Sequence, residues 1–345
     1  MVELSSDLIT RIDGKAGRIT LNRPKALNAL SYEMVLGIEK ILNNWRGDEA
    51  VELVIIDAVG EKAFCAGGDI QEMYRTATEG NFNYGRRFWA DEYRMNALIA
   101  EYPKPFIAFI QGFDMGGGVG VSCHCSHRIV GDSTRIAMPE CGIGLIPDIG
   151  GSLLLGRAPG HCGEYIGTTG YRMGPGDAIF AGFADHYLPE AAWPELISTL
   201  CETGDSEAIN QVAQPSPNAP LCGMQERIDA HFGSESMNII WAELPNGDFG
   251  DDARAALSRQ SPLSLACAVP IIRASRAADD IRKALSYEYG FTARSASHGD
   301  FIEGIRAAVI DKDRNPNWKH QSIADVSEAE IKTMLQPFTE IPLEF

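Results

Sequence analysis

Apolar residues alternate with polar ones at the beginning of the chain, which is the pattern of strands buried on one face. On both sides of the polar stretch DGKAG, residues 7–22 predict the two strands of a hairpin. A stripe at helical spacing follows, and Ser31 is placed to cap this helix. The alternating and striped positions are Leu8, Thr10, Ile12, Ile19 and Leu21, then Met34, Ile38, Ile41, Leu42 and Trp45.

Two almost continuous apolar runs predict strands that are buried on both faces. They are VELVIIDA at 51–58 and KPFIAFIQG at 104–112, and each precedes a glycine-rich turn that leads into a helix. We expect further helices at 81–102 and at GGSLLLGRAPG, and short strands at 127–132 and 135–140. This alternation of strands and helices predicts an α/β fold.

The composition changes after residue 188. The segment TGDSEAINQVAQPSPNAPLCG, residues 203–223, is polar and proline-rich, and predicts a loop or linker. The remainder reads mostly as helices. We therefore expect two domains, an α/β core at 1–188 and a mainly α-helical C-terminal region at 189–345.

The chain is acidic and of ordinary globular composition. It has 345 residues, of which 45% are hydrophobic, so it can bury a sizeable core. The 30 Lys and Arg residues and 47 Asp and Glu residues give a net charge of −17, which does not favour nucleic acid or anionic membranes as partners. No apolar run predicts a membrane-spanning helix. The N-terminal sequence lacks a signal core or an Arg-rich transit pattern, and eight scattered cysteines suit a reducing compartment, so we expect a cytoplasmic protein or a mature form whose targeting segment was removed.

Several kinds of site are not favoured by the motifs. The cluster CHCSH at 123–127 has no second CxxC or HxxxH to complete a set of four ligands, so we expect no metal site. Neither GxGxxG at the start of a helix nor GxxxxGK[ST] is present. A serine hydrolase is unsupported because GxSxG is absent. No histidine in its motif could activate Cys65, which we expect to be a buried filler.

The stretch MPECGIGLIPDIGG, residues 138–151, places two acids in apolar surroundings. Glu140 and Asp148 lie eight positions apart, and acids are costly to bury without partners. Upstream, CAGGD and MGGGVG are turns in which glycine lets the backbone approach a ligand closely. Two such turns could aim their N–H groups at one oxygen and form an oxyanion hole.

Four motifs in this order resemble the enoyl-CoA hydratase/isomerase (crotonase) superfamily: LNRPKALNALS, KAFCAGGDI, KPFIAFIQGFDMGGGVG and MPECGIGLIPDIGG. The resemblance implies a crotonase-like spiral core of ββα units and a thioester substrate carried on coenzyme A. It implies that the N–H groups of Gly68 and Gly117 bind the thioester oxygen. The turns near coenzyme A and the substrate contain Lys25, Ala26, Ala66, Gly67 and Asp69. No separate cofactor is implied, because coenzyme A is part of the substrate.

Within the superfamily, the chain resembles the branch of 3-hydroxyisobutyryl-CoA hydrolases. Hydratases have a second glutamate three residues after the position of Gly117, where this chain has Gly120, and dienoyl-CoA isomerases have an aspartate there. The hydrolase branch also matches GFADHY at 182–187 and SASHGDFIEGIRAAVIDKDRNPNWK at 295–319. It places an acid in the helix before the KPF strand, and motif alignment favours Glu92 over Asp91. Valine breakdown is the pathway implied by this branch.

The implied reaction is hydrolysis of a 3-hydroxyacyl-CoA thioester to the free acid and coenzyme A. Glu140 would either attack the carbonyl to form an anhydride or activate a water molecule as general base. Asp148 would bind the substrate hydroxyl, orient water or tune Glu140, but it could equally cap the following helix. Glu92 would recognise the 3-hydroxyl group, and a solvated helix face is the competing interpretation.

Two other functions remain open from the sequence. One is an enoyl-CoA hydratase or dienoyl-CoA isomerase of the same superfamily, and the other is a catalytically inactive CoA-binding member. In the C-terminal motif, we expect Arg306 and Lys312 to belong to a salt-bridged helix and loop rather than to bind a CoA phosphate. The chain could also form a homo-oligomer, as crotonases often do.

Overall fold

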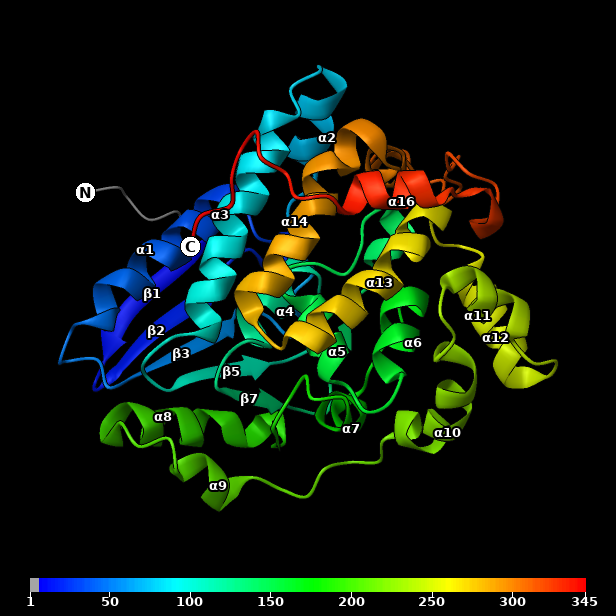
Figure 1. Ribbon diagram of the computed structural model, residues 1–345. Coiled ribbons are helices and arrows are strands. Elements are labelled where there is room, and N and C mark those ends of the chain that lie inside the picture. Colours follow the sequence, from blue (N-terminus) through cyan, green and yellow to red (C-terminus); the bar gives the residue numbers. More distant parts are fainter. Residues whose placement is uncertain (1–5) are drawn as a thin grey trace. The chain divides into compact units, whose positions relative to one another are not determined.

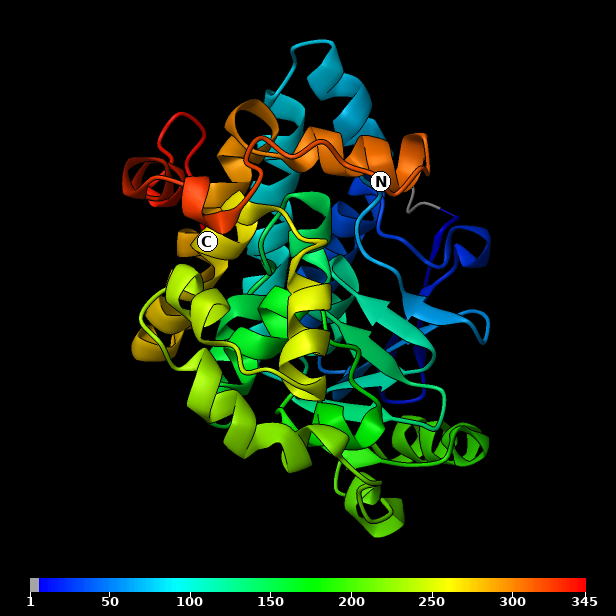
Figure 2. The same ribbon diagram turned by 90° about the vertical axis from the view of Figure 1, so that its right-hand side faces the viewer.

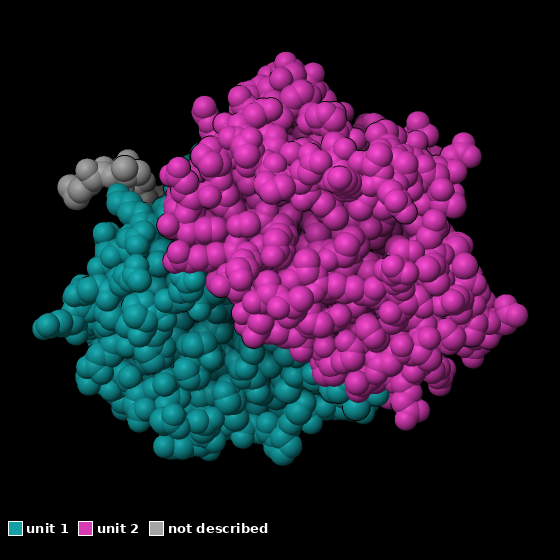
Figure 3. Space-filling model, in the orientation of Figure 1, with its two compact units in different colours: residues 1–68, 95–137, 173–222 teal, residues 69–94, 138–172, 223–345 magenta. Residues whose placement is uncertain are grey.

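The structure is a computed structural model that describes residues 6–345 (Figure 1). The described chain divides into two compact units (Figure 3). Unit 1 comprises the chain up to Gly68 and the segments Met95–Ala137 and Met173–Cys222. Unit 2 takes Asp69–Arg94, Met138–Arg172 and Gly223–Phe345. Each unit is built from several separated segments, so neighbouring residues in space often lie far apart in sequence.

A six-stranded sheet of order β1-β2-β3-β5-β7-β9 forms the centre of unit 1 (Figure 1). β1 and β2 pair antiparallel, as the hairpin pattern predicted, and all later pairs are parallel. The buried runs became β3 and β5, whose side chains pack with those of α8 in one apolar cluster. The strands are Leu8–Asp13, Ala16–Leu21, Leu53–Ala58, Phe106–Ile110, His127–Val130 and His186–Tyr187.

A second, smaller sheet in unit 1 consists of three parallel strands in the order β4-β6-β8. Its strands are Ala63–Cys65, Phe113–Met115 and Arg135–Ala137. We predicted the third strand but expected glycine turns at the first two, because three residues are too few to show an alternating pattern. The small sheet matters for the site, since the glycine turns follow β4 and β6 directly.

The helices of unit 1 follow the predicted pattern with one correction. Ser31 caps α1 by accepting a hydrogen bond of 3.3 Å from the Met34 N–H. The segment 203–223, predicted as a linker, instead contains the helix α9, and α10 begins within it. The helices that lie in unit 1 are α1 (Tyr32–Arg46), α4 (Gly117–Ser122), α7 (Pro175–Phe180), α8 (Trp193–Thr203) and α9 (Ala208–Val212).

Unit 2 is almost entirely helical, and residues 223–345 contain no strand among the described residues (Figures 1 and 2). This confirms the predicted helical C-terminal region. Its central helix α13 packs against α5, α6 and α14. The helices are α2 (Gln71–Thr78), α5 (Gly151–Arg157), α6 (Cys162–Thr169), α11 (Met237–Glu243), α12 (Asp248–Leu257), α13 (Pro262–Ala278), α14 (Ile281–His298), α15 (Phe301–Ile305) and α16 (Glu328–Leu335).

Two helices contain the boundary between the units within their length. α3 (Asn83–Ala100) fills most of the segment predicted to be helical at 81–102, and its residues up to Arg94 belong to unit 2. α10 (Pro220–Phe232) begins in unit 1 and continues in unit 2. A membrane-spanning helix, which must be long and apolar, is not found among the described residues.

Candidate active site

The two glycine turns lie side by side in unit 1. They follow β4 and β6, which are neighbours in a parallel sheet, so both turns lie at the same edge of that sheet. A Cβ atom built on Gly67 would lie 3.5 Å from the Met115 carbonyl oxygen and 4.0 Å from the Gly117 nitrogen. A Cβ on Gly118 would lie 2.6 Å from the Cys65 carbonyl oxygen, so the first turn of α4 packs directly against the end of β4.

The backbone at these turns leaves two amides available. Gly67 and Gly116 have φ angles of 108° and 50°, which favour glycine. Gly117 is the first residue of α4, where an N–H group has no partner within the helix. Within residues 6–345, the N–H groups of Gly68 and Gly117 donate to no backbone acceptor. Two such amides at one sheet edge are suited to stabilise a negatively charged oxygen.

The turn containing Lys25 is fixed against the ends of β3 and β4. Asn28, at a φ of 57°, donates hydrogen bonds of 3.0 Å to the Val59 carbonyl and 2.9 Å to the Ala63 carbonyl. The Ala66 N–H donates to the Leu27 carbonyl at 3.0 Å. The structure therefore brings the predicted coenzyme A residues Lys25, Ala26 and Ala66 to one loop region. A pocket of about 510 Å³ lies there, lined by Lys25 and Lys62 among others.

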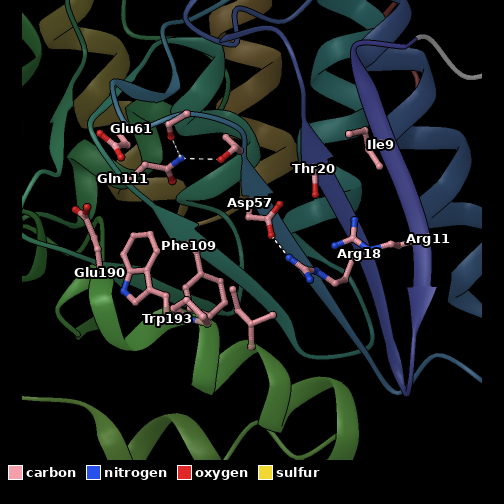
Figure 4. Close-up of a pocket in the computed structure, with 14 residues that line it drawn as sticks. Ile9, Arg11, Arg18, Thr20, Asp57, Glu61, Phe109, Gln111, Glu190 and Trp193 are labelled. Atoms are coloured by element: carbon pink, nitrogen blue, oxygen red, sulfur yellow. Dashed lines mark hydrogen bonds and ion pairs between the residues drawn. The ribbon is translucent and has the colours of Figure 1, made fainter.

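A second pocket in unit 1 is lined by none of the residues that the sequence predicted for the active site (Figure 4). It has a volume of about 610 Å³ on the face of the large sheet next to the start of α8. Arg18 and Asp57 form an ion pair on its floor, and the rings of Phe109 and Trp193 meet on its wall at a centroid distance of 5.4 Å and a tilt of 58°. The residues of this pocket alternate along strands that also form the core, so no separate motif identified it.

Asp69 belongs to unit 2, where it precedes α2. Its Oδ1 atom lies 3.4 Å from the Gln71 N–H at the start of that helix. The side chain thus acts on the local backbone, in the manner of an Asx turn.

Glu140 lies in unit 2, in the short 3₁₀ helix η2 (Glu140–Ile143). The residue is 4% exposed, and neither carboxylate oxygen has a hydrogen-bond partner within the described residues. Burial raises the pKa of Glu140 well above its usual value, and the charge of Asp148 raises it further. A buried carboxyl group without a partner is costly, so its place is explained best by a ligand or a reaction.

Asp148 does not cap the helix that follows it. α5 begins at Gly151, and its N-cap residue Gly150 uses no side-chain hydrogen bond. The Asp148 carboxylate instead accepts a hydrogen bond of 2.7 Å from the Tyr93 hydroxyl. Burial raises the pKa of Asp148 to about 7, although the Tyr93 hydrogen bond opposes this shift. The capping interpretation is therefore wrong, and Asp148 can exchange a proton near neutral pH.

Glu92, on α3, is buried rather than solvated. It is 3% exposed, and its Oε1 atom has no hydrogen-bond partner within the described residues. Its pKa is raised well above the usual value by burial and by the charge of Asp148. The neighbouring Asp91 instead forms an ion pair of 2.8 Å with Arg94. Glu92, Glu140 and Asp148 thus form one interacting group of acids in unit 2.

Three further residues of this group had no signal in the sequence. Tyr93 is fully buried between Asp148 and Thr292, with its Oη atom 3.2 Å from Thr292 Oγ1. Glu288 is also fully buried, and its carboxylate accepts hydrogen bonds from the turn after Asp148. Thr292 and Glu288 lie one turn apart on α14. Their contacts span more than 130 residues of sequence, which no local pattern reveals.

Two of the buried polar side chains of unit 1 were also not singled out from the sequence. Asp114, next to the second glycine turn, accepts a hydrogen bond of 2.5 Å from Ser122, and burial raises its pKa to about 7. Asn96 is fully buried, and its side-chain oxygen and nitrogen have no partner within the described residues.

Cys65 and Arg306 take the structural roles expected of them. Cys65 is fully buried. No group of His, Cys, Asp and Glu residues that could hold a metal ion occurs among residues 6–345. Arg306 forms ion pairs with Glu303, Asp311 and Asp313, so it belongs to a salt-bridged helix and loop.

Known proteins match this chain over nearly its whole length. A family model described as enoyl-CoA hydratase/isomerase matches residues 16–335. The 3-hydroxyisobutyryl-CoA hydrolase, mitochondrial, of Danio rerio is 37% identical over 337 residues, which cover 94% of this chain and 87% of that protein. The crystal structure of an enoyl-CoA hydratase from Rhodobacter sphaeroides 2.4.1 is 50% identical, with a TM-score of 0.91, and the match covers 96% of this chain and 98% of that one.

A carnitinyl-CoA dehydratase from Mycobacterium thermoresistibile is 36% identical, with a TM-score of 0.94 over 99% of both chains. The three names share a CoA-linked compound and differ in the reaction. The comparisons confirm the predicted resemblance and the crotonase-like α/β fold with its helical C-terminal region. The chain therefore belongs to the enoyl-CoA hydratase/isomerase family and has the fold of the crotonase superfamily.

Proposed function

We propose that this protein hydrolyses the thioester of 3-hydroxyisobutyryl-CoA to 3-hydroxyisobutyrate and coenzyme A. The family supports an acyl-CoA substrate, and the relative from Danio rerio carries the name of this hydrolase. The observation that carries the proposal is the buried Glu140 carboxyl group, which lacks any partner within the described residues and interacts with the charge of Asp148. A carboxylate such as Glu140 can drive hydrolysis either as nucleophile or as general base.

The thioester carbonyl would accept hydrogen bonds from the N–H groups of Gly68 and Gly117. Negative charge develops on this oxygen when the carbonyl carbon is attacked, so the two amides stabilise the transition state more than the substrate. The resemblance described above combines these two amides with Glu140 in one reaction.

Two routes lead from this arrangement to the same products. In the first, a Glu140 oxygen bonds to the carbonyl carbon, the C–S bond breaks with coenzyme A as leaving group, and water then hydrolyses the anhydride. In the second, Glu140 takes a proton from water while the water oxygen attacks the carbonyl carbon; the C–S bond then breaks, and the leaving thiolate of coenzyme A takes up the proton. Both routes need Glu140 in its ionised form.

Glu92 and Asp148 would recognise the acyl group. The Oε1 atom of Glu92 is buried without a partner within the described residues, so a substrate hydroxyl group could satisfy it. Burial and the charge of Asp148 raise the pKa of Glu92, which favours its protonated form, and a protonated carboxyl group can both donate to a hydroxyl and accept from it. This chemistry fits a neutral 3-hydroxyacyl group.

Hydration is the second candidate, because the solved relatives are named as a hydratase and a dehydratase. Gly120, where the resemblance places the second acid of hydratases, lies within α4 and has no side chain that could act as acid or base. This residue favours hydrolysis over hydration.

The test measures free-thiol release across a panel of acyl-CoA substrates, with 3-hydroxyisobutyryl-CoA and 3-hydroxypropionyl-CoA included. Double-bond absorbance of enoyl-CoA substrates is followed in parallel. The proposal requires thiol release that is fastest with a 3-hydroxyacyl substrate and abolished in Glu140→Gln. Rapid hydration of enoyl-CoA without thiol release would contradict it, and coenzyme A binding without turnover would indicate an inactive member.

A further inference from the structure

Glu288 connects the late helix α14 to the turn that follows Asp148. Its Oε2 atom accepts the Gly150 N–H at 2.8 Å, and its Oε1 atom accepts the Ser152 N–H at 3.0 Å. The Ser152 hydroxyl also donates to Oε1 and lies 2.8 Å from the Ser275 hydroxyl oxygen. Three donors from one short turn therefore meet a single carboxylate, in the manner of a backbone nest around an anion.

The turn that Glu288 holds has an unfavourable backbone conformation. Ile149 has a φ of 56° and Gly150 a φ of 77°. A left-handed conformation is rare for a β-branched residue such as isoleucine and persists only where the surroundings enforce it. Ile149 comes directly after Asp148, so whatever enforces this conformation also sets the direction in which the Asp148 side chain leaves the backbone.

The same helix reaches Asp148 by a second route. Thr292 lies four residues after Glu288 and therefore on the same face of α14. Its Oγ1 atom is 3.2 Å from Tyr93 Oη, and the single phenolic proton is used for the bond to Asp148. Tyr93 can therefore accept from Thr292 while it donates to Asp148. One helix face thus constrains the backbone after Asp148 and the partner of its carboxylate.

We propose that Glu288 is a positioning residue for the acids of this site: it fixes the strained 149–152 turn, and together with Thr292 it sets the orientation of Asp148. The inference rests on the proposed function, because this positioning affects a reaction only if Asp148 and Glu140 carry it. It assigns a role in the active site to a helix of the C-terminal region.

Glu288 also acts through its charge. The pKa of Glu288 is raised to about 8, mainly by burial and in smaller part by the charge of Asp148, while the hydrogen bond from Ser152 opposes the shift. In turn, the charge of Glu288 contributes to the raised pKa of Glu140. A positioning residue of this kind therefore leaves a signature in the titration of its neighbours, which a merely structural residue would not.

The experiment compares Glu288→Gln with a matched control. Glutamine has the same shape, but its amide group would face one of the backbone N–H donors, so the turn loses an acceptor. The control is Glu164→Gln, which replaces another fully buried glutamate of unit 2 that pairs with Arg273 and Arg276. A milder variant, Ser152→Ala, removes one of the three donors and serves if Glu288→Gln does not fold.

Two measurements are made on each variant. The first is kcat and KM against pH with the acyl-CoA that the wild-type protein hydrolyses fastest. The second is ¹³C NMR titration of labelled Glu and Asp carboxyl groups without substrate, with signals assigned through Glu140→Gln and Asp148→Asn.

We expect Glu288→Gln to lower kcat by roughly 10–100-fold with little change in KM, because misplacement of a reacting group acts mainly on the chemical step. The pKa of Glu140 should move downward, because a neighbouring negative charge that helps to raise it has been removed. Ser152→Ala should lower kcat by a smaller factor. Glu164→Gln should lower the melting temperature while its pH profile and carboxyl titrations match those of the wild type.

The proposal is overturned if Glu288→Gln, or Ser152→Ala where the former does not fold, keeps the wild-type kcat and carboxyl titrations. If Glu140→Gln abolishes hydrolysis while those two variants do not alter it, the proposed function stands and this inference fails. If the wild type hydrolyses no thioester, the proposed function fails, and the substrate-free titrations still decide whether Glu288 sets the state of Glu140.

Discussion

Tyr93 donates a hydrogen bond of 2.7 Å to Asp148, and both side chains are buried. The bond favours the ionised carboxylate, whereas burial favours the protonated form, and the balance gives Asp148 a pKa of about 7. Because the phenol itself titrates well above its usual value, it stays a donor throughout the neutral range. The pair therefore provides a group that changes its charge near physiological pH while its partner does not.

Replacing Tyr93 by phenylalanine should raise the pKa of Asp148 above about 7, because the hydrogen bond that lowers it is lost. We expect a further rise of roughly 1 unit, measured by ¹³C NMR titration of the Asp148 carboxyl group. Tyr287→Phe is the matched control, since Tyr287 lies on α14 and is 38% exposed. An unchanged Asp148 titration in Tyr93→Phe would show that the hydrogen bond has no influence on this acid.

The rate of hydrolysis should increase with pH. Both proposed routes use ionised Glu140, whose pKa is raised well above its usual value by burial and then by Asp148. We therefore expect kcat/KM to fall tenfold per pH unit on the acidic side of this raised pKa. In Asp148→Asn the acidic limb of the pH profile should move to lower pH, because the charge of Asp148 no longer helps to raise the pKa of Glu140. A profile that stays flat between about pH 5 and 9 would exclude Glu140 as the essential ionised group.

Stability should fall as pH rises, which is opposite to the usual effect of an aspartate in an ion pair. The unfolded state loses the Asp148 proton near its ordinary pKa, while the folded state retains it up to a pKa of about 7. The unfolded state therefore binds fewer protons between these values, and the free energy of unfolding decreases across this window, by up to about 4 kcal/mol.

Urea unfolding at several pH values tests this prediction. Asp148→Asn should show a smaller decrease than the wild type and should be the more stable protein near pH 8. Asp252→Asn, at an exposed position on α12, serves as control and should keep the wild-type slope. Identical slopes in wild type and Asp148→Asn would mean that Asp148 titrates alike in the folded and unfolded chain.

A methyl group at Gly118 should impair the glycine turns. Its Cβ atom would lie 2.6 Å from the Cys65 carbonyl oxygen, so α4 would have to move away from the end of β4 and shift the Gly117 N–H. We expect Gly118→Ala to lower kcat by roughly 10²-fold. Gly174→Ala, where a Cβ meets no atom within 4 Å, should retain full activity. Equal activity of the two variants in thiol-release assays would show that the packing of α4 is not critical.

The parts of the fold that were predictable are those with a strong local pattern. The apolar runs at 51–58 and 104–112 became β3 and β5, because strands covered on both faces need apolar side chains throughout. The strands β4 and β6 were not predicted, because each has three residues, which are too few to show an alternation of apolar and polar positions. The helix α9 was not predicted, because its five residues lie within a polar and proline-rich stretch.

The candidate site divides in the same way. Glu140 and Asp148 were identified because both lie in a family motif. The sequence left two roles open for Asp148, a helix cap or a catalytic acid, and the structure excludes the helix cap. For Glu92, solvation and burial gave the same sequence pattern. Tyr93 meets Asp148 across 55 residues and Glu288 meets Gly150 across 138, so these contacts depend on the tertiary fold alone.

The distance in sequence between Gly150 and Glu288 has a consequence for the order in which the protein matures. At a synthesis rate of about 5–20 residues per second, the 138 residues between them take roughly 7–28 seconds to appear. A growing chain therefore displays the four family motifs well before the carboxylate that holds the turn after Asp148 has been made. An arrested or truncated chain that ends before α14 would look like a complete family member by its motifs and still lack an ordered acid pair.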